Sequence, residues 1–377
     1  MHTILIAGAG GIGKATGLIL LSKPYLDCKV IIGDRYESAA NAAAKYIAEG
    51  SGTDMVSPLL FPESGTSEAL ITALQQADII LDCLPGSQAP RLAQYAKDYG
   101  CHYANLTEYV NETDQVTEIA KGADTGFILQ TGLAPGYINI LSHHLFQKFT
   151  SDYQVETVDN LDMKVGALSK HARAPYFYAY TWSPIGVATE YVKDAIVVQD
   201  FETKYIPSLS DTEELLIDGI KYEDDYTSGG AADLPRALAG RVKNLNYKTI
   251  RYPGHYTWAK KILASAPVEQ DKVEYLHNTM MDNIPAVEDD VVIVFASVKG
   301  KDNNGTLRAI ERSLSVYPSK VGSQTLRAIQ TTTAAPLCQA ASLLLKGNLK
   351  GPIFQSELAT SEFLNGDFVK DIYGSVS

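Results

Sequence analysis

The first 34 residues restrict the fold of this chain more than any other stretch. An apolar run at residues 3–7 is followed by Gly8, Gly10 and Gly13, and an apolar helical pattern continues from them. A second apolar run then ends at the acidic Asp34. Strand, glycine turn, helix and a second strand closing on an acid are together typical of a βαβ unit that binds a dinucleotide.

Each residue of the turn has a physical task in such a unit. Gly8 permits the tight turn, Gly10 lets the backbone approach a pyrophosphate, and Gly13 lets the helix pack closely on the strand. The helix that begins near Gly11 and Ile12 directs free N–H groups and its positive dipole end at the phosphates. Glycines alone also serve ordinary turns, so the whole βαβ context carries the prediction.

The residues after the second strand bear on the choice of cofactor. Asp34 lies about 20 residues beyond the last glycine, where a carboxylate can accept hydrogen bonds from the adenosine ribose. Its charge would repel a 2′-phosphate, which favours NAD. Arg35 follows directly and could instead bind that phosphate or stack on adenine, so NADP remains an alternative.

Composition narrows the class of protein. With 377 residues the chain exceeds one ordinary core, so we expect two domains. A net charge of −12 argues against nucleic acid or an anionic membrane as the main partner. The pattern of a signal peptide and a run of transmembrane length are both missing. The cysteines form no C-x-x-C pair, which favours reduced thiols and a cytoplasmic location: Cys28, Cys83, Cys101 and Cys338.

Beyond Asp34 the alternation of strand and helix patterns continues to residue 129. Helices are predicted at residues 37–48, 67–75, 90–99 and 110–121, with strands at 56–61, 79–84, 101–105 and 126–129. Six strands with intervening helices predict an α/β fold, a doubly wound parallel sheet of the Rossmann type. Ligands bind such sheets outside the carboxyl ends of the strands. Residues 84–88, 105–109 and 130–139 should therefore face the nicotinamide.

The pattern changes after residue 139. Strand-like segments dominate at residues 162–168, 176–182, 196–198, 248–252 and 291–298, with helices at 185–192 and 256–264. The turn cluster at 301–305 joins 291–298 to 306–316 in a long hairpin. We therefore expect a second, α+β domain with a mainly antiparallel sheet. A large sheet face usually packs on a partner, and a twofold homodimer is the commonest solution.

Residues 325–346 form a helical pattern that should return to the first domain. This predicts a Rossmann domain at 1–135 plus 325–377, and a substrate-binding and dimerisation domain at 136–324.

Short motifs spread along nearly the whole chain resemble one family. They are G-A-G-G-I-G at residues 8–13, C-L-P-G at 83–86, Y-A-N-L-T-E-Y at 103–109, T-G-L-A-P-G-Y-I-N-I-L at 131–141, T-W-S-P-I-G at 181–186, T-I-R-Y-P-G-H at 249–255 and Q-T-T-T at 330–333. In these motifs the chain is similar to the saccharopine dehydrogenase family, in the branch with saccharopine reductase, lysine 6-dehydrogenase and carboxynorspermidine dehydrogenase. The resemblance implies a nicotinamide-linked oxidation or reduction at a C–N bond of an amino acid.

Candidate site residues in the first domain follow from the sheet rule and the resemblance. Leu84, Pro85 and Gly86 match the family's turn beside the nicotinamide, although a plain strand-to-helix turn would look the same. Thr107 and Glu108 lie just past the fifth strand, where ligand is expected, but they could equally begin the helix at residue 110.

Candidate substrate-binding residues also come from the second domain. Arg173 lies in the basic segment 169–173, which suits a carboxylate but also an ordinary solvated loop. Trp182 belongs to the W-S-P match and could instead be a core tryptophan. Arg251 and His255 flank a Pro-Gly turn, with a structural ion pair as the alternative.

The sequence leaves the catalytic group unassigned. His143 and His144 are adjacent on a helix and cannot share one metal-binding face, so we predict no metal site. Saccharopine dehydrogenase activity is the preferred function, with lysine 6-dehydrogenase next and carboxynorspermidine dehydrogenase as a further alternative. A reductase for an aldehyde and a non-catalytic NAD-binding protein represent other classes of function.

Overall fold

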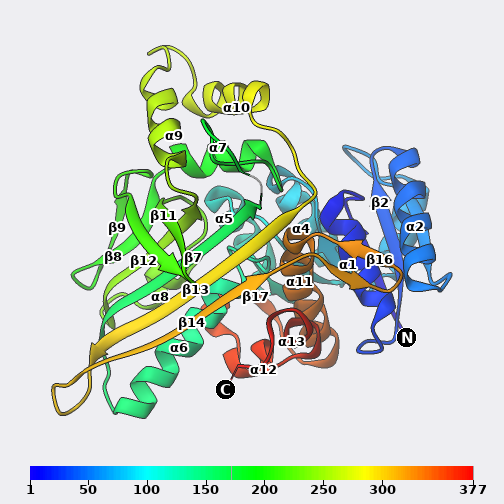
Figure 1. Ribbon diagram of the computed structural model, residues 1–377. Helices are drawn as coiled ribbons and strands as arrows, with labels where there is room; N and C mark the ends of the chain where they lie inside the picture. The colour runs from blue at the N-terminus through cyan, green and yellow to red at the C-terminus, as the bar shows by residue number, and fades with distance from the viewer. Residues whose placement is uncertain (171, 377) are drawn as a thin grey trace. The chain divides into compact units, whose positions relative to one another are not determined.

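The computed structural model describes residues 1–170 and 172–376, which fold into two compact units. Unit 1 contains Met1–Tyr137, Ser319–Leu326 and Gln330–Ser377, and unit 2 contains Ile138–Pro318 and Arg327–Ile329. The chain passes from unit 1 to unit 2 after Tyr137 and returns to unit 1 at Ser319, with residues 327–329 again in unit 2. Figure 1 shows the helices and strands of both units, coloured from the N-terminus to the C-terminus.

Unit 1 is built on a seven-stranded parallel sheet with the order β17-β6-β5-β4-β1-β2-β3. The N-terminal part of the chain supplies β1 (His2–Ala7), α1 (Gly11–Ser22), β2 (Cys28–Asp34), α2 (Glu37–Ser51), β3 (Val56–Leu60), α3 (Glu68–Gln76), β4 (Ile79–Asp82), the short turn η1 (Gly86–Gln88), α4 (Ala89–Tyr99), β5 (His102–Asn105), α5 (Val110–Ala120) and β6 (Gly126–Ile128). The α/β fold and its doubly wound parallel sheet are confirmed.

Local sequence explains where these helices start and stop. The Ser67 side chain caps α3 by accepting a hydrogen bond from the N–H of Leu70. Helix α4 has a proline in its first turn and ends at Gly100, whose φ of +69° few other residues tolerate. The sheet and helices bury an apolar cluster that includes Leu5, Ile80 and Phe127.

Residues near the C-terminus add a seventh strand that the sequence did not indicate. They form β15 (Ser319–Val321), β16 (Gln324–Leu326), α11 (Ala328–Lys346), β17 (Gly351–Ile353), the short turn η2 (Gln355–Glu357), α12 (Thr360–Leu364) and α13 (Asp367–Tyr373). Strand β17 pairs in parallel with β6 at the edge of the sheet. The helix expected from residue 325 begins at Ala328 instead, because residues 324–326 pair with β15.

Unit 2 contains a mixed sheet with the order β10-β11-β12-β7-β13-β14, and β8 and β9 extend from β12. Its elements are α6 (Tyr137–Tyr153), β7 (Val158–Ser169), α7 (Pro184–Val192), β8 (Ala195–Gln199), β9 (Glu202–Ile206), β10 (Glu213–Ile217), β11 (Ile220–Tyr226), α8 (Leu234–Ala237), β12 (Val242–Arg251), α9 (His255–Ala264), α10 (Lys272–Asn283), β13 (Asp290–Lys301) and β14 (Leu307–Val316). The predicted hairpin is present as β13 and β14 (Figure 1). All pairings in this sheet are antiparallel except β12 with β7.

One predicted strand in unit 2 is wrong. Residues 176–182 form turns and a single bridge from Tyr180 to Ala286 rather than a strand. The backbone at Phe177 has a φ of +48°, which interrupts an extended conformation. Tyr178 and Tyr180 are 2% and 4% exposed in an apolar cluster with α7, α9 and α10. Burial of these neighbouring aromatic side chains therefore replaces strand pairing.

Candidate functional site

The glycine turn of unit 1 has the geometry that a dinucleotide requires. Gly8 has a φ of +106°, and a Cβ there would lie 2.7 Å from the carbonyl oxygen of Cys83. A Cβ on Gly13 would lie 1.8 Å from the carbonyl oxygen of Gly8, so helix and turn are in close contact. A Cβ on Gly10, in contrast, would meet no atom of the described residues within 4 Å apart from those of its chain neighbours. The turn is packed on its inner side and open at Gly10, where a pyrophosphate would approach.

The start of α1 supplies donors at the same place. The helix begins at Gly11 after Gly10, and no side chain caps it. The N–H groups of its first turn, at Gly11, Ile12 and Gly13, have no helical carbonyl to bind. These donors and the helix dipole suit an anionic ligand, so the residues present fit the phosphates of a dinucleotide.

Asp34 closes β2 beside this turn. Its Oδ2 accepts a hydrogen bond from the N–H of Ala9 at 3.1 Å, and its Oδ1 accepts from the N–H of Tyr36 at 3.1 Å. The neighbouring Arg35 forms an ion pair with Glu63 and stacks over the ring of Tyr36 at 4.7 Å. The guanidinium is thus already occupied by a carboxylate, which lowers its capacity to bind a phosphate.

Two predicted site segments from neighbouring strands lie together. A Cβ on Gly86, just past β4, would lie 2.3 Å from Oγ1 of Thr107 and 2.6 Å from the ring of Tyr109, just past β5. Thr107 is buried, and Glu108 is half-buried with its pKa raised by loss of solvation. The carboxyl edge of the sheet therefore brings the Leu84, Pro85 and Gly86 turn against the Thr107 and Glu108 segment.

A buried pair beneath this edge was missed by the sequence reading. Asp82, the last residue of β4, accepts hydrogen bonds from the N–H of Leu84 at 3.0 Å and from Oη of Tyr103 at 2.7 Å. Burial raises the pKa of Asp82 to about 6, against the opposing effect of these two hydrogen bonds. The sequence signal that could have revealed this pair is the acidic residue at the end of the apolar run I-I-L-D, residues 79–82. The pair fixes the turn that contains Leu84.

Two predicted substrate residues of unit 2 lie inside a chain of hydrogen bonds. Nε of Arg251, the last residue of β12, donates to Oη of Tyr191 at 2.7 Å. Oη of Tyr191 lies 2.9 Å from Nε2 of His255, the first residue of α9, and Nδ1 of His255 lies 2.7 Å from the carbonyl oxygen of Tyr176. This assigns the proton of His255 to Nδ1, with Tyr191 donating to Nε2.

The charge of Arg251 is enclosed by aromatic rings. The side chain is 1% exposed, and its guanidinium lies 4.7 Å from the ring centre of Tyr178 and 5.6 Å from that of Tyr191. Burial and then the charge of Arg251 lower the pKa of His255 to about 3. His255 is therefore neutral at physiological pH. Among the described residues, Nη2 of Arg251 has no hydrogen-bond partner.

The remaining predicted residues of unit 2 lie outside this hydrogen-bond chain. Arg173 is exposed, and its carbonyl oxygen accepts a hydrogen bond from the N–H of Phe177 at 2.9 Å. Position 171, in the same basic segment, falls outside the described residues. Trp182 is half-buried against the aromatic cluster, and a Cβ on Gly186 would lie 2.5 Å from its ring.

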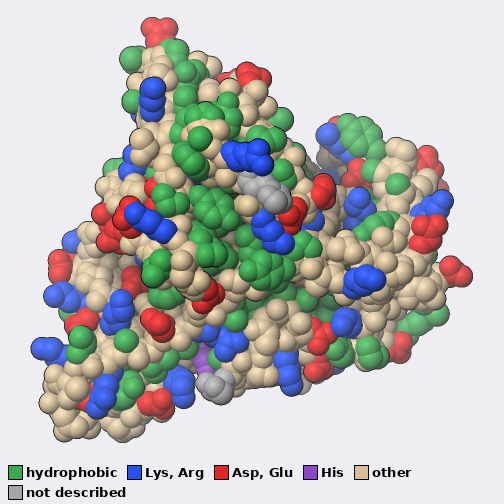
Figure 2. Space-filling view, viewed as in Figure 1, with side chains coloured by type: hydrophobic (Ala, Val, Ile, Leu, Met, Phe, Trp, Pro, Cys, Tyr) green, Lys and Arg blue, Asp and Glu red, His purple; other side chains and the backbone are tan. Residues whose placement is uncertain are grey.

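Two further findings concern the part of the chain that the structure describes. Across residues 1–170 and 172–376, no three His, Cys, Asp or Glu side chains gather in a way that could hold a metal ion. Within the same residues, no helix combines the length and apolar character needed to cross a bilayer. On the face shown in Figure 2, cationic and anionic side chains are interspersed.

Fold and turn together define an NAD(P)-binding Rossmann protein with a second α+β unit. Residues 4–128 match the family model described as saccharopine dehydrogenase NADP binding domain, and residues 132–367 match that of the saccharopine dehydrogenase C-terminal domain. The chain therefore belongs to the saccharopine dehydrogenase family, whose members include NAD(P)-binding oxidoreductases.

Two solved structures share the fold over nearly the entire chain. Saccharopine dehydrogenase (L-Glu forming) from Saccharomyces cerevisiae is 14% identical, with a TM-score of 0.74 over 99% of this chain and 98% of that one. Homospermidine synthase from Legionella pneumophila, solved in complex with NAD, is 12% identical, with a TM-score of 0.68 over 100% and 90% of the two chains. At these identities the likeness concerns the fold.

Proposed function

We propose that the protein is an NAD-linked oxidoreductase acting at the C–N bond of an amino acid, with saccharopine as the preferred substrate. The observation that carries the proposal is the pairing, in one chain, of an open dinucleotide turn with a second unit matched over residues 132–367 by the saccharopine dehydrogenase C-terminal domain. Lysine 6-dehydrogenase and carboxynorspermidine dehydrogenase activities are the alternatives within this class.

The residues of unit 1 would hold the cofactor. Gly10, Gly11 and Ile12 would bind the pyrophosphate through backbone N–H groups, and Asp34 would accept hydrogen bonds from the adenosine ribose. Bound NAD supplies the acceptor for hydride. Because Asp34 is anionic and Arg35 is already paired with Glu63, we propose that NAD is preferred over NADP.

Substrate recognition needs cations for carboxylates and groups that handle the proton of the amine. Arg173 is exposed and free to form a bidentate contact with a substrate carboxylate. Thr107 and Glu108 lie at the carboxyl edge of the sheet, where we propose that they contact the reacting amine. The raised pKa of Glu108 brings its carboxyl closer to neutral pH, where accepting and releasing a proton are both feasible.

The decisive experiment is an activity matrix of two cofactors against three substrates. The purified protein would be assayed with NAD and NADP, each against saccharopine, lysine and carboxynorspermidine, by absorbance of the reduced nicotinamide. We expect the largest kcat/KM with saccharopine and NAD. Tight cofactor binding without hydride transfer from any substrate would instead identify a non-catalytic NAD-binding protein.

The proposed reaction would take place in the cytoplasm. This proposal rests on the cysteines: Cys28, Cys83, Cys101 and Cys338 are all free thiols, three of them buried.

A further inference from the structure

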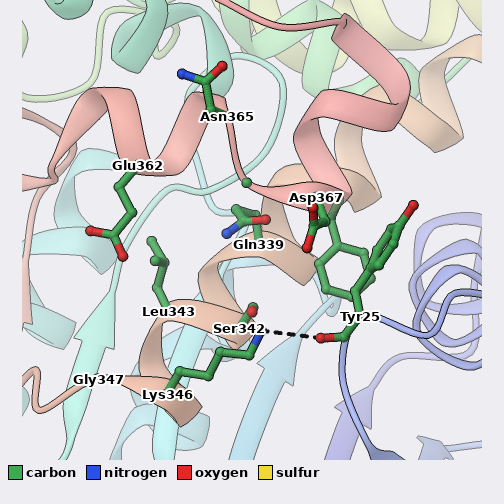
Figure 3. A pocket seen from close by; sticks show the side chains of 11 residues that line it. Tyr25, Gln339, Ser342, Leu343, Lys346, Gly347, Glu362, Asn365 and Asp367 are labelled. Carbon is green, nitrogen blue, oxygen red and sulfur yellow. Dashed lines mark hydrogen bonds between the residues drawn. The ribbon is translucent and has the colours of Figure 1, made fainter.

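A small polar cavity lies in unit 1 among segments that the dinucleotide turn does not use. Its volume is about 260 Å³, and it is bounded by α11, α12, the start of α13 and the loop that follows α1 (Figure 3). Its polar lining side chains are Tyr25, Gln339, Ser342, Lys346, Glu362, Asn365 and Asp367.

Gln339 places a buried amide at the centre of this cavity (Figure 3). The residue is 5% exposed, and its Oε1 has no hydrogen-bond partner among the described residues. A Cβ on Gly366 would lie 2.1–2.3 Å from the three terminal atoms of the amide, so the turn before α13 closes directly on it. A buried amide is stable only when its polar atoms find partners, which makes this one suited to a polar ligand.

Opposite charges line the cavity without neutralising each other. Nζ of Lys346 donates to the carbonyl oxygen of Tyr25 at 3.2 Å, which leaves two of its three N–H groups free. Within the described residues, Lys346, Glu362 and Asp367 take part in no ion pair. Figure 3 shows Gln339 between Glu362 and Asp367, with the Lys346 side chain below it, beside Ser342. An ammonium group and two carboxylates thus border one small volume unpaired.

We propose that this cavity binds a small free amino acid. The ligand's ammonium would lie at Glu362, its carboxylate at Lys346, and the Gln339 amide would contact the atoms between them. A water molecule occupies about 30 Å³ in the liquid, so 260 Å³ corresponds to roughly nine water-sized groups, the size of a common amino acid. A carboxylic acid or an amine alone would satisfy one end only. The proposal concerns binding and does not rest on the function proposed above.

Isothermal titration of the full chain tests the proposal. Glycine, L-glutamate and L-lysine would be titrated as ligands, with acetate and ethylamine as probes of a single charge. We expect at least one amino acid to bind ten-fold or more tightly than either single-charge probe. Lys346→Met and Glu362→Gln should each weaken that binding about ten-fold. Lys320→Met and Glu68→Gln, at exposed positions of unit 1 outside the cavity, should leave it unchanged.

Three results would overturn the proposal. The first is that none of the three amino acids binds, and the second is that ethylamine binds as tightly as the amino acids do. The third is an amino-acid affinity that neither cavity variant alters, which would place the ligand at another site. Because the readout is the heat of binding, a protein that transfers no hydride gives the same test. Thermal unfolding of each variant confirms that it is folded before titration.

Discussion

We propose that the choice between NAD and NADP rests on three exposed or half-exposed side chains: Asp34 at the end of β2, Arg35 and Glu63. Asp34 accepts hydrogen bonds from two backbone N–H groups, which orients its carboxylate, and Glu63 holds Arg35. An adenosine 2′-phosphate bound beside Asp34 would therefore meet two anions and one paired cation. A phosphate would have to displace Glu63 from Arg35 and approach Asp34, so both carboxylates disfavour NADP.

We expect NADH to bind more tightly than NADPH, and Asp34→Ala to narrow the difference. Glu63→Gln should lower the Kd for NADPH several-fold, because it releases Arg35 and removes one negative charge. Fluorescence titration with both nucleotides measures these values, and Glu68→Gln serves as the control. Equal affinities of the unmutated protein for NADH and NADPH would contradict the prediction.

The two arginines predicted to bind substrate differ in their surroundings. We expect Arg173→Ala to raise KM for a dicarboxylic substrate about 30-fold, since a bidentate charged contact is worth roughly 2 kcal/mol. Arg251→Ala should raise KM too, and because Arg251 is enclosed it should also lower the free energy of unfolding.

Steady-state kinetics measures the change in KM of both arginine variants, and urea unfolding measures the change in the free energy of unfolding of Arg251→Ala. The exposed Lys272 provides a control as Lys272→Ala. Unchanged kinetics in both arginine variants would place substrate recognition at other residues.

Among the elements, β12, α7 and α9 are tied together by Tyr191. Its hydroxyl accepts from Arg251 and lies beside Nε2 of His255, and all three side chains are buried. We expect Tyr191→Phe to lower the free energy of unfolding by about 2–3 kcal/mol, because it leaves a buried charged donor without an acceptor. Tyr205→Phe, at a tyrosine that is 61% exposed, should change it by less than about 0.5 kcal/mol. Similar losses in both variants would show that the chain of hydrogen bonds contributes little.

The end of β4 should add a pH dependence to stability. The folded-state pKa of Asp82, about 6, lies above its ordinary value of 3.8, so the folded protein favours the protonated form. Its stabilising contribution is therefore complete below about pH 3.8 and is lost as the pH rises through 6. Asp82→Asn cannot titrate, so the difference in unfolding free energy between wild type and variant should change over this range. The exposed Asp114 provides the control as Asp114→Asn, and a pH-independent difference for Asp82→Asn would refute the prediction.

Elements whose stability depends on distant partners were the ones that the sequence did not reveal. In β11, Glu223, Asp224 and Asp225 are all buried, which no local pattern predicts. Lys164 and Lys248 pair with Asp224, Lys260 pairs with Asp225 at 2.8 Å, and Glu223 accepts from two N–H groups at the start of α9. These partners come from β7, β12 and α9 and are apparent only after folding.

Periodic segments with local caps were predictable by contrast. The β1–α1–β2 unit, helices α2 to α5 and the β13–β14 hairpin follow from apolar spacing and turn residues. In the candidate site, the glycine turn and the contact between Gly86 and Thr107 were predictable, because ligands bind open parallel sheets outside the carboxyl ends of the strands. The Asp82–Tyr103 pair does not, since only the register of β4 with β5 brings the two side chains together.

At the scale of the whole molecule, β14 is an edge strand of the unit 2 sheet, and none of its ten residues is buried. Exposed edges and sheet faces are the usual places where a second copy binds. The homodimer stays a prediction, and we propose β14 as the strand through which the two copies associate.

Sedimentation velocity at micromolar concentrations should give twice the mass of one chain. Ile310→Asp on β14 should shift the protein towards the monomer, because a buried carboxylate would oppose association. Leu216→Asp should leave the measured mass unchanged, because Leu216 lies on β10 at the opposite edge of the sheet and is already 71% exposed. A monomeric mass for the unmutated protein at these concentrations would exclude the dimer.

The late strand β17 has a consequence for biosynthesis. Its partner β6 leaves the ribosome long before it, since residues 129–350, including all of unit 2, must be made in between. During that interval the edge of β6 has no neighbour on that side, and unpaired edges invite aggregation. The nascent chain would therefore hold an incomplete parallel sheet in unit 1 while unit 2 is being synthesised, and this is the stage at which a chaperone would help most.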